Sequence, residues 1–171
     1  MRTPDLLSTA VLSLSLSLSS AVSASEVASN PLKNVYFGET HVHTAYSLDA
    51  YLGGTRLTPS DAYRHARGEA VIVNGKPSRL RVPLDFAAVT DHAEYLGEMY
   101  AAQHPDAPGA DAPEIRQLVT MTDPNERRKW FLKYVIGNSR SGNPGHLPFY
   151  PGDAVAASGW RVLVEAAEAH N

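Results

Sequence analysis

Two histidines near the start of the chain have the side chains and the spacing to bind a metal ion. His41 and His43 follow the apolar run Val35-Tyr36-Phe37, which we interpret as a short buried strand. Residues i and i+2 of an extended chain point to the same side, so we expect both imidazoles to project together. Neutral imidazole is a ligand of zinc, manganese and iron. Because a metal needs further donors, the spacing predicts only the beginning of a site.

Further candidate ligands follow a second apolar run. Residues 86–90 are typical of another buried strand, and Asp91 and His92 come directly after it. Asp49 lies in the loop that leaves the first strand, eight residues after His41. In folds that alternate strands and helices, catalytic groups gather where parallel strands end. We therefore expect these imidazoles and carboxylates to converge. The alternative for an isolated pair of histidines is a solvated strand end or turn.

The motifs around these residues resemble those of a known superfamily. Segments 39–44, 47–49 and 89–92 are similar to the metal-binding motifs of the PHP (polymerase and histidinol phosphatase) superfamily. The resemblance covers roughly residues 34–171, with its specific motifs in 36–97. A longer set of matches resembles one uncharacterised branch, domain of unknown function family 3604: Tyr36-Phe37-Gly38, Asp49-Ala50-Tyr51, Leu57-Thr58-Pro59, Asp61-Ala62-Tyr63, Gly68-Glu69 and Asp91-His92-Ala93-Glu94-Tyr95-Leu96-Gly97.

This resemblance implies an α/β fold, a distorted seven-stranded (β/α) barrel that carries two or three divalent metal ions, zinc, manganese or iron. The ligands that it implies in this chain are His41, His43, His92 and Asp49, the last for the outermost ion. In similar proteins a glutamate and further histidines from later strands complete the metal cluster. The resemblance thus predicts an incomplete ligand set in this chain.

Three further acids are expected around these ligands. Asp91 is expected either to bind a metal or to orient an imidazole, because a carboxylate next to a metal site does both. Glu39 and Glu94 are expected just outside the ligands. Glu94 alternatively favours the start of a helix.

The chemistry implied is hydrolysis. Divalent ions lower the pKa of a bound water and stabilise charge on a phosphoryl or acyl oxygen, and phosphoester hydrolysis is the usual activity of PHP-like enzymes. We therefore expect the substrate to be a small molecule with a phosphoester group. The sequence does not identify a general acid. Two alternatives stay open: an amidohydrolase-like enzyme with one ion that acts on C–N bonds, and an exported metal-binding protein without activity.

The chain divides into three segments of different composition. Residues 1–24 have a positive start, an apolar and serine-rich run and small residues at the end, as in a secretory signal peptide, so we predict a periplasmic or secreted protein. Residues 25–33 are a polar linker. Residues 34–171 contain only two barrel-type strands, which cannot close a sheet. We expect them to be the amino-terminal portion of a metal-dependent hydrolase domain that is inactive alone.

The remaining patterns predict the elements that position the site. Thr58 and Pro59 are typical of a helix start. We interpret His65, in that helix, as a surface residue. Gly137 is expected to end a helix, and Trp160 to lie on the buried face of another. The predicted elements are a loop at 45–57, a helix at 58–67, a hairpin with arms at 70–73 and 79–82, a strand at 84–90, helices at 113–122 and 123–137, a loop at 137–153, and a last helix from Asp153 or Ser158 to His170.

Composition excludes several classes of protein. The 171 residues are long enough for one domain with a core, and a net charge of −3 does not favour nucleic acid as a partner. With no cysteine, disulfides and thiolate ligands are excluded. No segment suits a stable membrane span. The basic run at 127–129 favours a solvated helix face over a phosphate-binding patch. Nothing in the composition indicates an oligomeric state.

Overall fold

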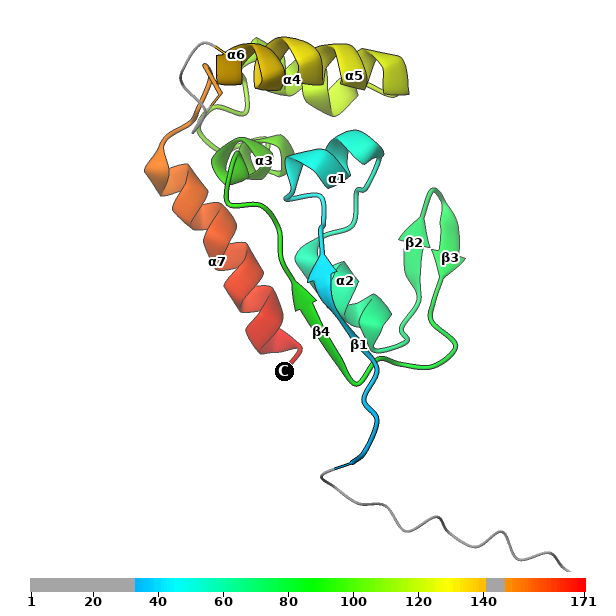
Figure 1. Cartoon of the computed structure of the whole chain (residues 1–171). Coiled ribbons are helices and arrows are strands. Elements are labelled where there is room, and N and C mark those ends of the chain that lie inside the picture. Colours follow the sequence, from blue (N-terminus) through cyan, green and yellow to red (C-terminus); the bar gives the residue numbers. More distant parts are fainter. Residues whose placement is uncertain (1–32, 141–146) are drawn as a thin grey trace, which may run out of the picture. The chain divides into compact units, whose positions relative to one another are not determined.

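The structure, a computed structural model, describes residues 33–140 and 147–171, with the side chains of 139 and 140 left aside. Its elements all belong to the unit Val35–Asn171 (Figure 1). The predicted signal peptide and all of the predicted linker except Lys33 lie outside the described residues. The unit mixes helices with two small sheets, so the predicted α/β class is confirmed.

The sheet that matters for the site consists of two parallel strands, β1 (Gly38–Val42) and β4 (Phe86–Val89). Gly38 pairs with Phe86, and a Cβ at this glycine would collide with the Phe86 ring and carbonyl oxygen, so glycine permits the close pairing. The prediction of a buried strand at residues 35–37 was wrong. These three residues are 61–73% exposed and precede β1, and none of them belongs to the core clusters.

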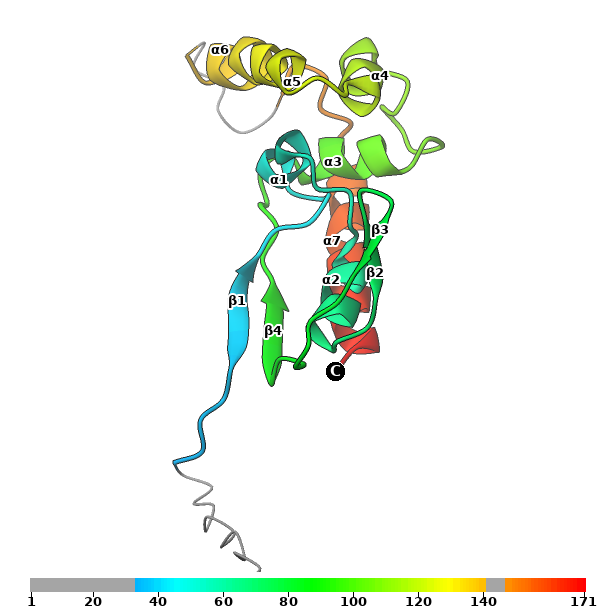
Figure 2. The ribbon, with the colours of Figure 1, turned by 90° about the vertical axis from the view of Figure 1, so that its right-hand side faces the viewer.

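Strand β4 was expected to be covered on both faces, and this was also wrong. Phe86 is 46% exposed and the other three residues of β4 are only partly buried. The reason lies in the helices α2 (Pro59–Ala66) and α7 (Asp153–Ala169), which pack against β4 and lie on the same side of the sheet (Figure 2). Within the described residues the two strands form no closed barrel, so the predicted barrel is not confirmed.

Helix α2 follows the prediction closely. Thr58 is its N-cap and forms a reciprocal capping box with Asp61, and Pro59 occupies the first turn. The chain leaves the helix through Gly68, whose φ of +79° suits glycine. The predicted loop at 45–57, by contrast, contains a short helix, α1 (Leu48–Gly53). It forms because Leu48 and its neighbours have apolar partners in the core.

The hairpin is tighter than predicted. Strands β2 (Val71–Val73) and β3 (Lys76–Ser78) are antiparallel and joined by Asn74 and Gly75 alone. Both turn residues have positive φ, at 51° and 75°, which matches the right-handed twist of a two-residue hairpin. The return strand therefore begins at Lys76, three residues before the predicted arm at 79–82.

Helices make up the rest of the unit: α3 (Leu96–Gln103), α4 (Pro113–Thr120), α5 (Pro124–Phe131), the π-helix η1 (Leu132–Ile136), α6 (Gly137–Arg140) and α7. Gly137 does not end a helix as predicted; its φ of −60° continues the helix into α6. Trp160 is 61% exposed, because α7 turns Val155, Gly159 and Leu163 inward instead. None of the described helices is long and apolar enough to cross a membrane.

The core lies between α1, α3, α4 and α5. Leu48 and Tyr51 of α1 contact Met99, Leu118 and Trp130 there. A second cluster joins Tyr46, Leu96 and Leu163, and so attaches α7 to α3. Ala45 and Tyr46, in the loop that follows β1, belong to the first and the second cluster.

The close packing of α7 on α3 gives a test of the fold. A Cβ at Gly159 would lie 2.9 Å from Cγ of Leu96 and 3.2 Å from its carbonyl oxygen. We expect Gly159→Ala to destabilise the unit by about 1–3 kcal/mol, because the two helices must move apart. The measurement is the urea midpoint of unfolding at unchanged m-value.

Gly53→Ala is the matched control for this substitution. Gly53 is also helical, but nothing lies within 4 Å of its would-be Cβ. We expect this variant to be neutral or more stable by about 0.5–1 kcal/mol, because alanine favours the helix. Equal midpoints for the two variants would contradict the packing argument.

Candidate metal centre

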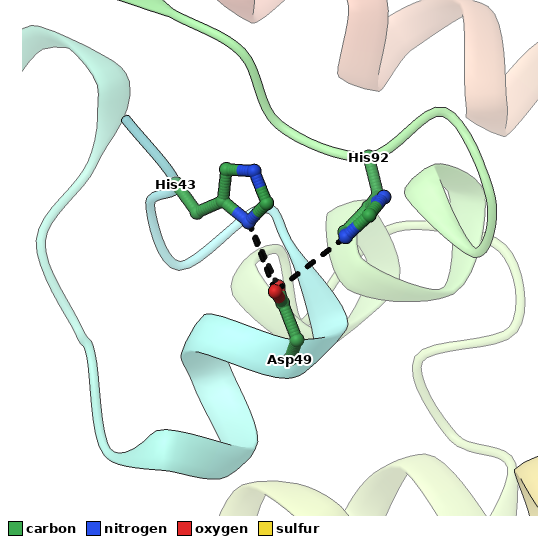
Figure 3. Close-up of side chains that lie close together, drawn as sticks. All are labelled: His43, Asp49 and His92. Carbon is green, nitrogen blue, oxygen red and sulfur yellow. Dashed lines mark hydrogen bonds and ion pairs between the residues drawn. The ribbon is translucent and has the colours of Figure 1, made fainter. Parts of the chain in front are cut away.

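Three side chains from separate segments meet at one edge of the β1–β4 sheet. His43 follows β1, His92 follows β4, and Asp49 lies in the first turn of α1 (Figure 3). Asp49 Oδ2 lies 2.9 Å from Nδ1 of His43 and 3.5 Å from Nε2 of His92. Parallel strands end at the same edge, so the pairing itself brings the two imidazoles together.

His41 lies next to this group. Its Nε2 atom is 3.0 Å from Nε2 of His43, so the expectation that both rings project to the same side is confirmed. Because a carboxylate only accepts hydrogen bonds, the Asp49 contact assigns the proton of a neutral His43 ring to Nδ1. Nε2 of His43 is then left as an acceptor for His41, or as a metal ligand.

Two hydroxyl-bearing residues tie the loop after β1 to the loop after β4. Asp91 accepts hydrogen bonds from Thr44 with both carboxylate oxygens, one from the backbone N–H and one from the hydroxyl at 2.6 Å. Ser47 Oγ accepts a bond of 2.8 Å from the backbone N–H of His92. Thr44 and Ser47 are at most 1% exposed. These bonds fix where the backbone of His92 lies relative to His43.

Asp91 therefore has a positioning role in the described structure. Both of its oxygens are engaged by Thr44, and it is not part of the group that could hold a metal. These hydrogen bonds come from Thr44 and not from an imidazole, so whether Asp91 orients an imidazole or binds a metal stays a prediction. Ser47 was predicted only as part of the motif at 47–49, and its importance was missed because a loop serine carries no pattern that reveals burial.

Asp49 is kept ionised by its surroundings. Burial acts to raise the pKa of this carboxyl, but the Ala50 backbone N–H at 2.7 Å and the imidazoles of His43 and His92 outweigh it and lower the pKa. A charged carboxylate between two imidazoles is the form that binds a cation. Asp49 is 53% exposed and His92 49%, so solvent reaches the group, whereas His43 is 17% exposed.

The two glutamates lie at the margin of the site. Glu39 Oε1 accepts hydrogen bonds from the backbone N–H groups of Thr40 and His41, and thereby stabilises the backbone that carries the first histidine. Glu94 Oε2 lies 3.7 Å from Nδ1 of His92. Neither belongs to the group of potential ligands. A role for the two glutamates just outside the ligands stays a prediction.

The donor spacing is suitable for a divalent ion. Ligand atoms about 2.0–2.2 Å from a tetrahedral ion lie about 3.3–3.6 Å from one another. Ligand atoms of His43, Asp49 and His92 all lie within 4.8 Å of one another, so small side-chain rotations would bring them to that spacing. The Nε2 atoms of His41 and His43 offer a second pair. The group His43, Asp49 and His92 could therefore hold one ion.

Comparison with known proteins gives one finding. A family model described as "Protein of unknown function (DUF3604)" matches residues 30–171. No curated protein and no solved structure matches the chain.

The tie between Thr44 and Asp91 can be tested without a metal. Asp91→Ala leaves the N–H and the hydroxyl of a buried threonine without their acceptor, so we expect a loss of about 1–3 kcal/mol in the free energy of unfolding. Asp91→Asn retains a carbonyl acceptor and should recover part of this loss. Chemical denaturation measures both variants.

Asp106→Ala serves as the control for loss of a carboxylate, because Asp106 is exposed in the loop between α3 and α4. Its unfolding midpoint should stay that of the parent chain. If Asp91→Ala were as stable as Asp106→Ala, the two loops would not depend on this tie.

Proposed function

The chain belongs to the DUF3604 family of proteins of unknown function, and from its cluster of imidazoles and carboxylate we propose that it acts as an exported, metal-dependent phosphoesterase. The observation that carries the proposal is the meeting of His43, Asp49 and His92 where β1 and β4 end. The proposed export rests on the composition of residues 1–24.

The type of hydrolase is inferred from the motifs in 39–44 and 89–92, which resemble those of PHP-type enzymes. We propose that the unit is part of a PHP-like barrel that holds two or three ions of zinc, manganese or iron. His43, Asp49 and His92 would hold one ion, and His41 would contribute to another. The mixed set of imidazole nitrogen and carboxylate oxygen supports these metals rather than calcium or magnesium.

The residues around the proposed metal site would have different roles, according to their positions. A bound divalent ion supplies Lewis acidity, which lowers the pKa of water and stabilises negative charge on a phosphoryl oxygen. Asp49 provides the negative charge of the site and orients the ring of His43 through Nδ1. Asp91, Thr44 and Ser47 hold the two loops at a fixed separation, so the ligands need little reorganisation.

Metal binding by the purified chain tests this assignment. We expect zinc or manganese to bind, and His43→Ala, Asp49→Ala and His92→Ala each to weaken the binding at least about tenfold, because each removes one of few donors. His65→Ala is the matched control, since His65 lies on α2 and contacts Ser78 rather than the group. Competition with a chromophoric chelator gives the affinities.

Metal content and hydrolysis decide between the classes of enzyme. For a chain that carries the whole of the proposed barrel we expect two or three ions and hydrolysis of generic phosphomonoesters or phosphodiesters with manganese or zinc. This activity should be lost in His41→Ala. One ion per chain and activity on C–N bonds would favour the amidohydrolase alternative instead. A protein that binds metal but hydrolyses none of these substrates would support the alternative of a metal-binding protein without activity. A metal affinity that none of the three ligand substitutions changes would refute the site.

A further inference from the structure

A second concave site lies beyond the far end of α1. An open pocket of about 530 Å³ is lined by residues 53–57 at and after the end of α1, by residues 72–74 of the β2–β3 hairpin, and by Thr122 and Arg127. Its charged lining residues are Arg56 and Arg127, and no acidic residue lines it. Thr55, Asn74 and Thr122 add polar groups to the lining, and Leu57 and Ile72 add apolar ones. The lining therefore combines positive charge with neutral polar groups and apolar side chains.

Arg127 has a buried donor that no described residue pairs. Its Nε atom is buried and has no hydrogen-bond acceptor among the described residues. A buried donor on a charged group costs more than a neutral one when it is left unpaired. The sequence predicted a solvated helix face for 127–129. Arg128 is exposed and Lys129 pairs with Glu126 at 2.8 Å, as on such a face, but Arg127 is partly buried and lines the cavity.

Arg56, the other arginine of the lining, is held in place by its neighbours. Its Nη1 atom donates hydrogen bonds of 2.7 Å to the carbonyl oxygens of Tyr51 and Thr55. The guanidinium also lies over the Tyr51 ring, 3.6 Å from its centroid. These contacts use one nitrogen of the fork, and no carboxylate among the described residues forms an ion pair with it. The arginine is thus oriented in advance, with donors left for a ligand.

We propose that this cavity binds the oxyanion group, phosphate or carboxylate, of a small organic molecule between Arg56 and Arg127. Guanidinium groups bind both oxyanions through paired N–H donors. The hydroxyls of Thr55 and Thr122 and the amide of Asn74 supply neutral donors, and Leu57 and Ile72 face the organic part. This site is separate from the metal centre and does not depend on the proposed hydrolase activity.

Anion titration of the full chain tests the proposal. Inorganic phosphate and acetate are titrated separately at low ionic strength with EDTA present, and binding is followed by calorimetry. We expect saturable binding of at least one anion, and a loss of affinity of about tenfold or more in Arg127→Gln and in Arg56→Gln. Chloride, tested as sodium chloride at equal ionic strength, should bind less tightly than that anion, because ionic screening alone does not discriminate between anions.

Two control variants isolate the cavity. Arg128→Gln removes an exposed arginine from the same helix and should bind the anion like the parent chain. His43→Ala removes a residue of the metal centre and should also leave anion binding unchanged, which separates this proposal from the hydrolase. Circular dichroism establishes that each variant is folded, and Arg56→Gln decides if Arg127→Gln does not fold. Failure of both anions to bind, or equal affinity in the arginine variants and in Arg128→Gln, would overturn the proposal.

Discussion

The parallel pairing of β1 with β4 is the constraint on which the candidate site depends. His43 and His92 are far apart in the sequence, and they come together only because the strands that precede them pair. The register of the strands, with Val42 opposite Val89, makes both chains leave the sheet at one edge. The backbone N–H of Thr90 then donates to the carbonyl oxygen of Val42 at 2.8 Å, which extends the pairing towards the site.

Beyond the ends of the strands, hydrogen bonds of buried polar groups hold the two loops together. Thr44 and Ser47 are almost fully buried, and each uses its side chain on the loop that carries His92. Unpaired, these groups would cost free energy, so the loops are stable chiefly in the arrangement that satisfies them. Asp49 and His92 remain about half exposed. The site thus combines a rigid backbone with side chains that solvent can reach, which suits the binding of a ligand from solution.

The sequence predicted the parts of this arrangement that follow from local rules. Side chains alternate along a strand, and threonine and proline begin helices, so the pairing of His41 with His43 and the start of α2 at Thr58 were foreseen. Predictions of burial from the sequence were wrong where burial depends on residues that are distant in the chain. Phe37 is exposed although it is apolar, and the predicted place of Trp160 was wrong, because no pattern states which face of a segment meets a neighbour.

Helix α1 shows why the metal centre cannot be understood from its ligands alone. A helix of six residues is too short to be stable by propensity, so its position must come from packing. Leu48 and Tyr51 provide that packing by entering the core beside Trp130 of α5. Asp49, between them in the sequence, is turned outward towards the two imidazoles. The geometry of the carboxylate is therefore fixed by apolar contacts on the opposite face of the same helical turn, and a change in that core would displace the ligand without touching the site.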